Sequence, residues 1–336
     1  MKWARLPSIA VGLVLVALAS TVEREDARAG SNIKPVTLPL DRDKEVDVRD
    51  GAALLTAPVE GMIHVPTTTF VMGSGALEQR VAVEMCRGEP LGGFCSDVQF
   101  YEEGMPHAVT LPGYWIDRTE VTVADYQRCV AVGDCPMPSF PSAGPPGDPK
   151  HDRPELPVTF VAWDDAEKFC AFRHARLPTE AEWERAARGA SGRRFPWGML
   201  PNPRIANHGA LDVGAELLPI AGPPTRVEIE QGVEDDIDGY AGLAPVGSFP
   251  DGQTPDGIRD LAGNASEWVA DYWSDGYDAA DVTAPSGPAS GAGRVVRGGS
   301  YRQPMAMIRS AAREGRLASA RAPDLGFRCA RSETGS

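Results

Sequence analysis

Oxygen-rich turns are the first candidates for chemistry in this sequence. Asp260 and Glu267 bracket a turn at Gly263, and Asn207 could act together with the Asp-Gly turn at Asp238. Calcium binds roughly six to eight oxygens from carboxylates, amide side chains and backbone carbonyls, and it tolerates irregular loops. By residue type alone, these turns fit two interpretations. They are either calcium sites or ordinary solvated loops, which are common in an acidic protein.

No other catalytic or metal-binding pattern is present locally. The five histidines form no HxxH, HxxxH or HxE pair, so a zinc or iron site would have to be assembled from distant residues. Ser300 follows Gly298-Gly299 without the GxSxG elbow of a hydrolase, which makes it a tight-turn serine. No glycine-rich phosphate loop is present either.

Charge and composition narrow the class of protein. The net charge of -14 argues against nucleic-acid binding, because phosphate contacts require clustered Lys and Arg. The 36 glycines and 30 prolines predict a turn-rich chain of short elements.

The N-terminus has the pattern of an export signal. Lys2 and Arg5 precede an apolar run at residues 9–19 that ends in small residues, and this run is shorter than the roughly 20 residues of a membrane span. We therefore predict a signal peptide over residues 1–19, with an uncleaved anchor or cleavage near residue 29 as alternatives. A linker over residues 20–57 and a domain over residues 58–333 follow. The predicted location is periplasmic or extracellular, without a stable membrane span.

Export changes the interpretation of the six cysteines, because an even number in an oxidising compartment predicts disulfides. Spacing pairs Cys86 with Cys95 and Cys129 with Cys135, which leaves Cys170 and Cys329. A cysteine metal site would require CxxC-like spacing, which is absent.

Short elements must position these residues. Helix caps are expected at Thr122 with Asp125, at Asp164 with Glu167, and at Thr179 with Glu182. Residues 75–105 are expected to form an irregular insertion. Strand-like runs are predicted at residues 62–72, 107–122, 157–163, 294–301, 308–313 and 325–331.

Several runs, taken together, resemble the formylglycine-generating enzyme family, also called the sulfatase-modifying factor family. In order they are WIDRTEVT, PVTFVAWDDAEKFC, RLPTEAEWERAARG, FPWG, APVGSFP, DLAGNASEW, RVVRGGSY and DLGFRCAR. They extend over about residues 60–331. The resemblance implies an α+β, loop-rich fold of the C-type-lectin-like type, with short strands and two or three helices.

The resemblance also implies metal ligands and a disulfide. It pairs Cys170 with Cys329 and implies two calcium sites built from side chains and backbone carbonyls. The implied ligands of the first site are Asn207, His208, Asp238 and Tyr240, and those of the second are Asp260, Gly263, Ala265 and Glu267.

Residues 301–313 depart from the family pattern. Authentic members bind copper through two cysteines just after the GGSY run, whereas this segment reads YRQPMAMIRSAAR. Gln303 stands near the first expected position and Met307 near the second, and one thioether cannot replace two thiolates. Ser266 stands where the family has tryptophan. Copper is therefore not expected. The His-x3-His-x-Glu helix of the iron-dependent members is also absent, and iron is left open.

Two functions follow from this comparison. The first is a calcium-stabilised binding or accessory module that keeps the family scaffold without copper-cysteine oxidase activity. The second is a non-cysteine oxidoreductase acting on a small molecule or peptide, since members similar to those of pyoverdine maturation act without the cysteine pair. Its pocket would be lined by Arg297, Ser300, Gln303, Arg309 and Arg313, although arginines in an acidic protein also pair surface carboxylates. We expect a monomer with an unspecified protein, peptide or small-molecule ligand.

Overall fold

The strands form small separate sheets in the computed structural model, which describes residues 60–89, 92, 95–139, 150–210, 236–278 and 282–333. All of these residues belong to the compact unit Arg49–Ser336. The predicted signal peptide (1–19) and linker (20–57) lie outside the described residues.

A four-stranded sheet carries the segments of most interest. Its order is β7-β6-β5-β8, and only the β5–β8 pair is parallel, with Ser266 opposite Leu325. Its strands are β5 (Ser266–Tyr272), β6 (Arg294–Arg297), β7 (Arg313–Arg316) and β8 (Leu325–Phe327). The predicted strand at residues 308–313 is wrong, because these residues form turns and β7 begins at Arg313.

The predicted run at residues 62–72 divides between two further sheets. Pro66 separates the two halves, since proline has no amide to donate to a strand ladder. One sheet has the order β1-β4-β9, and the other pairs β2 with β3. Their strands are β1 (Met62–Val65), β2 (Thr68–Met72), β3 (His107–Leu111), β4 (Tyr114–Asp117) and β9 (Ala330–Ser332).

The helices begin at two of the three predicted caps. The Thr122 hydroxyl accepts a hydrogen bond from the Asp125 amide, and the Thr179 hydroxyl accepts one from the Glu182 amide. The helices are α2 (Ala76–Arg87), α3 (Val123–Val132), α4 (Trp163–Phe172) and α5 (Glu180–Arg188), with the 3-10 turns η3 (Asp97–Glu103) and η4 (Pro250–Gly252).

The third predicted cap is displaced. Helix α4 begins after Ala162, and the Asp165 carboxylate accepts a hydrogen bond from the Ala162 amide at 3.0 Å. The strand predicted at residues 157–163 is wrong. Phe160 has a positive φ of 57°, which is incompatible with an extended strand, and the run makes only the isolated bridge between Thr122 and Pro157.

Helix α2 lies where an irregular insertion was expected. Ala82, Val83 and Cys86 form its buried stripe, and their spacing is helical. The described residues therefore contain four α-helices instead of two or three. The α+β class with short strands and long irregular connections is as expected.

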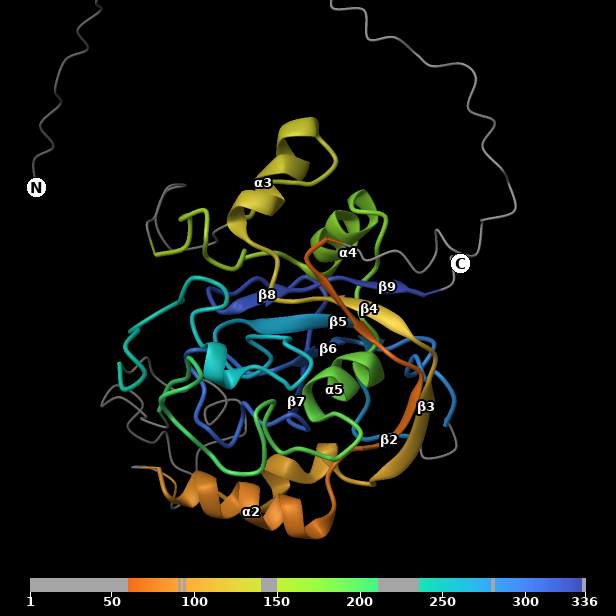
Figure 1. The fold of residues 1–336 in the computed structure, drawn as a ribbon, viewed down its shortest axis with the longest axis vertical. Coiled ribbons are helices and arrows are strands. Elements are labelled where there is room, and N and C mark those ends of the chain that lie inside the picture. The colour runs from red at the N-terminus through yellow and green to blue at the C-terminus, as the bar shows by residue number, and fades with distance from the viewer. Residues whose placement is uncertain are drawn as a thin grey trace, which may run out of the picture. The chain divides into compact units, whose positions relative to one another are not determined.

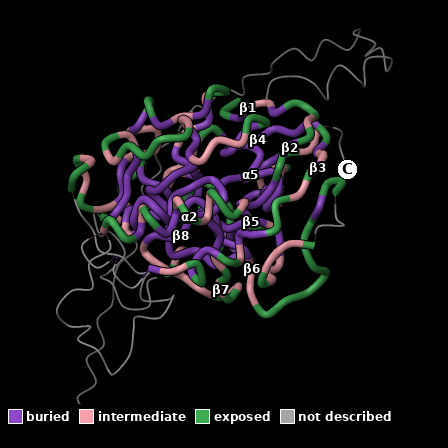
Figure 2. Tube along the Cα trace, turned by 90° about the horizontal axis from the view of Figure 1, so that it is seen from below, coloured by how far each residue is buried: buried purple, intermediate pink, exposed green. Residues whose placement is uncertain are grey.

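Helix α5 lies at the centre of the described residues, and it packs against β2, β3, β5 and β6 (Figure 1). All nine of its residues are buried, as the purple tube in Figure 2 shows. Its charged residues must therefore find partners inside the protein. Glu184 pairs with Arg297, and Arg188 pairs with Glu78.

All three predicted disulfides are confirmed: Cys86–Cys95, Cys129–Cys135 and Cys170–Cys329. The last ties α4 to the chain between β8 and β9. Within the described residues, no helix has the length and apolar character needed to cross a bilayer.

Candidate functional site

The segment that departs from the family pattern is folded into the interior. Residues 301–313 connect β6 to β7 through successive turns, and every residue from 303 to 313 is buried. Met307 packs against Phe100 and Ala306 in one cluster, and Met305 packs with Phe195 and Ile308 in another. These side chains fill the space beside β6.

The predicted pocket arginines are held by buried carboxylates. Arg297 donates to Glu184 at 2.5 Å, Arg309 donates to Glu103 at 2.7 Å, and Arg313 donates twice to Glu180 at 2.7 and 2.9 Å. Burial alone would raise the pKa of Glu180, but Arg313 and Arg297 outweigh burial and lower it. Their guanidinium groups therefore neutralise interior charges.

The remaining predicted pocket residues make local polar contacts. The Ser300 hydroxyl donates to Asp324 at 2.8 Å, and the Gln303 amide approaches Glu314 at 3.4 Å. Arg297, Gln303 and Arg313 line a cavity of only about 10 Å³, and Arg309 lines a second cavity of the same size. A volume of this size holds about one water. The structure thus brings these residues together without a ligand-sized space between them.

None of the cysteines has a free thiol. All six are consumed by the three disulfides. A copper site of two thiolates therefore has no ligands in the oxidised protein.

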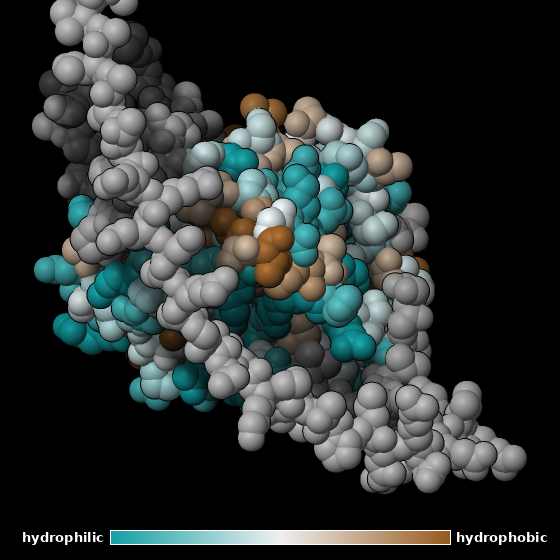
Figure 3. Space-filling view, turned by 90° about the horizontal axis from the view of Figure 1, so that it is seen from above, coloured by the Kyte–Doolittle hydropathy of each residue, from teal (hydrophilic) through white to brown (hydrophobic). Residues whose placement is uncertain are grey.

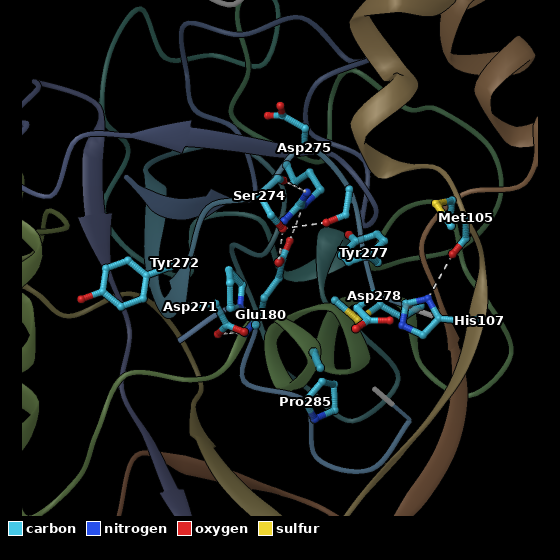
Figure 4. A pocket seen from close by; sticks show the side chains of 16 residues that line it. Met105, His107, Glu180, Asp271, Tyr272, Ser274, Asp275, Tyr277, Asp278 and Pro285 are labelled. Carbon is cyan, nitrogen blue, oxygen red and sulfur yellow. Dashed lines mark hydrogen bonds and ion pairs between the residues drawn. The ribbon is translucent and has the colours of Figure 1, made fainter. Parts of the chain in front are cut away.

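A much larger cavity, of about 460 Å³, lies at the C-terminal end of β5, where Asp271 and Tyr272 line it. The small cavity that Arg297 lines is at the opposite end of this strand, beside Ser266. It is enclosed by the N-terminus of α5, the end of β5, the loop that follows β5, and parts of β2 and β3 (Figure 4). Its volume falls within the range of small-molecule sites, roughly 300–1,000 Å³. Sixteen residues line it: Met72, Met105, His107, Glu180, Ala181, Asp271, Tyr272, Ser274, Asp275, Gly276, Tyr277, Asp278, Pro285, Gly287, Pro288 and Arg313.

Asp271 is the most perturbed acid of this cavity. It is 4% exposed, and its Oδ2 accepts a hydrogen bond from the Glu180 amide at 2.7 Å. Burial and the neighbouring Glu180 raise the pKa of Asp271 to about 8. An acid with a pKa near neutrality can both take up and release a proton, which is typical of functional sites.

Sequence reasoning did not find this cavity. Of its lining residues, it considered only Arg313 as a site residue. Asp271 and Glu180 are 91 positions apart in the sequence, so their proximity could not be read from it. A carboxylate inside a strand flanked by aromatics is the one signal that could have indicated it.

The residues predicted for the first calcium site lie together. Asp238 accepts hydrogen bonds from the amides of His208 and Tyr240, each at 2.9 Å. Asn207 is buried, and its Oδ1 has no hydrogen-bond partner among the residues that the structure describes. A buried orphan oxygen next to an aspartate loop fits a cation that prefers oxygen ligands.

The second predicted set is engaged differently. Glu267 is fully buried, and it accepts hydrogen bonds from Arg328 at 2.6 and 2.7 Å and from the Trp183 indole at 2.8 Å. A calcium ion at this loop would have to displace one of these donors. Among the described residues, no group of three or more His, Cys, Asp or Glu side chains is arranged to hold a metal.

The turn between these two sets requires its glycine. Gly263 has φ of +79°, and a Cβ at this position would lie 1.9 Å from the Asn207 carbonyl oxygen. The Asn264 amide donates to that same oxygen at 2.7 Å, and Ala265 is buried beside it. The two predicted sets are therefore neighbours joined through Asn207.

Asp260 faces a second carboxylate, Glu120. Asp260 accepts a hydrogen bond from the Gly247 amide at 2.5 Å, and Glu120 accepts one from the Asn264 side-chain amide at 2.9 Å. Burial raises the pKa of both groups, and for Glu120 the charge of Asp260 raises it further. Burial and the proximity of two carboxylates thus both favour the protonated form in this pair.

The face shown in Figure 3 is largely hydrophilic, with only small hydrophobic patches. The cavity that Asp271 lines is a better-defined candidate site than the visible part of this face.

Comparison with known proteins supports the sequence resemblance. Residues 52–333 match the model of the sulfatase-modifying factor enzyme 1-like domain. The formylglycine-generating enzyme of Bos taurus is 34% identical over 221 residues, covering 63% of this chain and 54% of that protein. The inactive C-alpha-formylglycine-generating enzyme 2 of the same organism is 35% identical over 193 residues, covering 55% of this chain and 53% of that protein.

A solved structure agrees. PvdO from Pseudomonas aeruginosa matches with a TM-score of 0.59 and 25% identity, covering 81% of this chain and 94% of that one. This chain thus matches nearly the full length of PvdO, whereas it spans only about half the length of the two curated Bos taurus relatives.

Proposed function

The chain belongs to the sulfatase-modifying factor family, and we propose that it is a member that binds a ligand without carrying out copper-cysteine oxidation. The observation that carries this proposal is the state of the cysteines, since all six form disulfides. Residues 301–313 add to it, because their buried side chains leave cavities of only about 10 Å³. The ligand would occupy the 460 Å³ cavity beside Asp271.

Incubation with a cysteine-containing sulfatase peptide tests this proposal. The purified protein, supplied with copper and oxygen, is expected to leave the peptide cysteine unchanged, as measured by mass spectrometry. A catalytically active formylglycine-generating enzyme serves as the positive control. Conversion of the cysteine to formylglycine above the level of a copper-only control would overturn the proposal.

An oxidoreductase of non-cysteine mechanism is the second candidate. It is favoured by Asp271, whose pKa of about 8 suits a general acid or base near neutral pH. Consumption of oxygen with a small molecule or peptide that depends on Asp271 would favour this candidate over simple binding.

We also propose calcium at the first predicted loop, where Asn207, Asp238 and the carbonyls of His208 and Tyr240 would hold it. Calcium would tie this loop to the Asn264 turn and supply structural stability. Asp238→Asn is expected to remove most of the calcium-dependent rise in melting temperature, because the site loses its one carboxylate. Differential scanning calorimetry in calcium and in chelator measures the effect.

Asp236→Asn is the matched control for this prediction, because Asp236 is exposed and two positions away. It should keep the calcium response of the wild type. A wild-type protein whose melting temperature is the same in calcium and chelator would contradict the calcium proposal.

Export is proposed on two grounds. Three disulfides fit an oxidising compartment, and the first 19 residues have the pattern of a signal peptide. Fractionation of cells that express the full chain, with mass spectrometry of the mature N-terminus, tests both.

A further inference from the structure

The cavity beside Asp271 combines apolar walls with an acidic floor. Figure 4 shows Asp271 and Glu180 on one side of it, with Met105 and His107 on the other. Its apolar lining residues come from several separate segments: Met72, Met105, Ala181, Tyr277, Pro285 and Pro288. A ligand that fits must therefore present both an apolar stem and a polar head.

Arg313, the only arginine among the described lining residues, already has hydrogen-bond partners in the protein. Arg313 makes its two hydrogen bonds to Glu180, donates to the Ser274 carbonyl at 2.8 Å, and stacks on Tyr277 with its Cζ 4.5 Å from the ring centroid. Glu180 and Arg313 thus neutralise each other. The described lining residues therefore offer an anionic ligand no unpaired arginine or lysine.

The remaining charges of the lining are acidic. Asp275 and Asp278 lie on the exposed rim, and Asp271 is buried at the floor. His107 directs its Nδ1 to the Met105 carbonyl at 3.0 Å. When Asp271 is ionised, the described lining therefore favours a cation over an anion.

Asp271 presents one carboxylate oxygen to the cavity. Its Oδ2 accepts the Glu180 amide, whereas its Oδ1 has no hydrogen bond among the described residues. A Cβ added to Gly287, which lines the same cavity, would lie 3.1 Å from this Oδ1. The residue itself is 4% exposed and lines the cavity, so this unpaired oxygen is where a ligand donor would bind.

We propose that the cavity binds a ligand with a positively charged amino group on an aliphatic stem, and that Asp271 is the counter-ion of this group. The inference rests on the proposed binding function. The stem would lie along Met72, Met105 and Pro285, and the ammonium would donate to Asp271 Oδ1. When the cation binds, the Asp271 carboxylic acid would ionise and release its proton to solvent.

Several groups around Asp271 set the pH dependence of this binding. Burial is the largest cause of the raised pKa of Asp271. Glu180 and Glu182 of α5 raise it further, and Arg313 of β7 lowers it. The loop after β5 adds Asp275, Tyr277 and Asp278, and β3 adds His107. Because burial and then Glu180 raise the pKa of Asp271 to about 8, Asp271 is mostly protonated at pH 7, and binding of a cation must displace that proton.

Calorimetric titration of the full protein with matched probes tests the proposal. Nα-acetyl-lysine amide, which keeps its side-chain ammonium, should bind at pH 8 roughly tenfold more tightly than Nα-acetyl-norleucine amide. The norleucine derivative has a similar aliphatic stem without the ammonium. The affinity of the lysine derivative should fall about fivefold from pH 8 to pH 7 and about ninefold from pH 7 to pH 6, following the ionised fraction of Asp271.

Asp271→Asn should lose roughly tenfold or more of the affinity at pH 8 and also lose the pH dependence. It should stay folded, because an asparagine oxygen can still accept the Glu180 amide. Asp275→Asn, on the exposed rim, is the control and should change the affinity by less than roughly threefold.

Three results would each overturn the proposal: no binding of the lysine derivative at pH 8, equal binding of both derivatives, or an affinity that is flat from pH 6 to pH 8. The comparison of the two ligands uses only the wild-type protein. It therefore tests the proposal even if the Asp271→Asn variant does not fold. Each of these results leaves the formylglycine assay unaffected, so the failure of this inference is distinguishable from the failure of the proposed function.

Discussion

Replacing Glu267 with alanine is expected to lower the free energy of unfolding by about 3–5 kcal/mol, the cost of leaving a buried charge without its partner. Glu267 and Arg328 are both fully buried, and two hydrogen bonds at 2.6 and 2.7 Å join them. The substitution also leaves the Trp183 indole without its acceptor. Urea unfolding followed by tryptophan fluorescence measures the loss.

This loss should be the same in calcium and in excess chelator, because the contacts of Glu267 with Arg328 and Trp183 require no metal. Glu155→Ala is the matched control, since Glu155 approaches Arg153 at 3.5 Å with both side chains about half exposed. It should cost no more than about 1 kcal/mol. A loss for Glu267→Ala that appears only in calcium would favour a metal at this loop over the ion pair.

Asp271→Asn is expected to stabilise the protein increasingly as the pH rises from 5 to 8. The folded pKa of Asp271, about 8, lies above the ordinary value of an aspartate, so the folded state holds a proton that the unfolded state has lost. The wild type therefore loses stability with rising pH over this window, at about 1.4 kcal/mol per pH unit for this one group, and asparagine does not. Unfolding curves of both proteins at each pH measure the difference.

The difference between the two proteins should level off above pH 8, where Asp271 is ionised in the folded state as well. Asp275→Asn should give a nearly constant difference from the wild type, because Asp275 is exposed. A constant difference for Asp271→Asn would show that Asp271 titrates normally.

Local features of this fold could be predicted from the sequence because their interactions are local. The caps at Thr122 and Thr179 each join residues three positions apart, and Cys129 and Cys135 are six positions apart. The resemblance to the family supplied the longest pairing, that of Cys170 with Cys329.

Other features could not be predicted because distant residues determine them. The sequence around Arg309 shows a cation but not that Glu103, 206 positions away, accepts from it. Likewise, residues 157–163 have the composition of a strand, yet Trp163 begins helix α4, and its indole donates to the Val269 carbonyl. Propensity in such short runs yields to tertiary packing.

The cavity is the clearest case of this limit. Its floor joins β5, α5 and β7, and its charge depends on which carboxylates already have partners. Glu180 would count as an unpaired acid from sequence, whereas in the structure Arg313 satisfies both of its oxygens. Only this pairing makes Asp271 the acid that remains for a ligand.

The short strands β8 and β9 have a consequence for the order in which the chain folds. Strand β8 pairs with β5, β9 pairs with β4, and Cys329 between them is bonded to Cys170, 159 positions earlier. Elements made early and midway in synthesis thus wait for partners that emerge near residue 330. Until then β4 and β5 keep open edges, and such non-local closure is slow and prone to aggregation. Folding of these two sheets is therefore completed only after β8 and β9 have been synthesised.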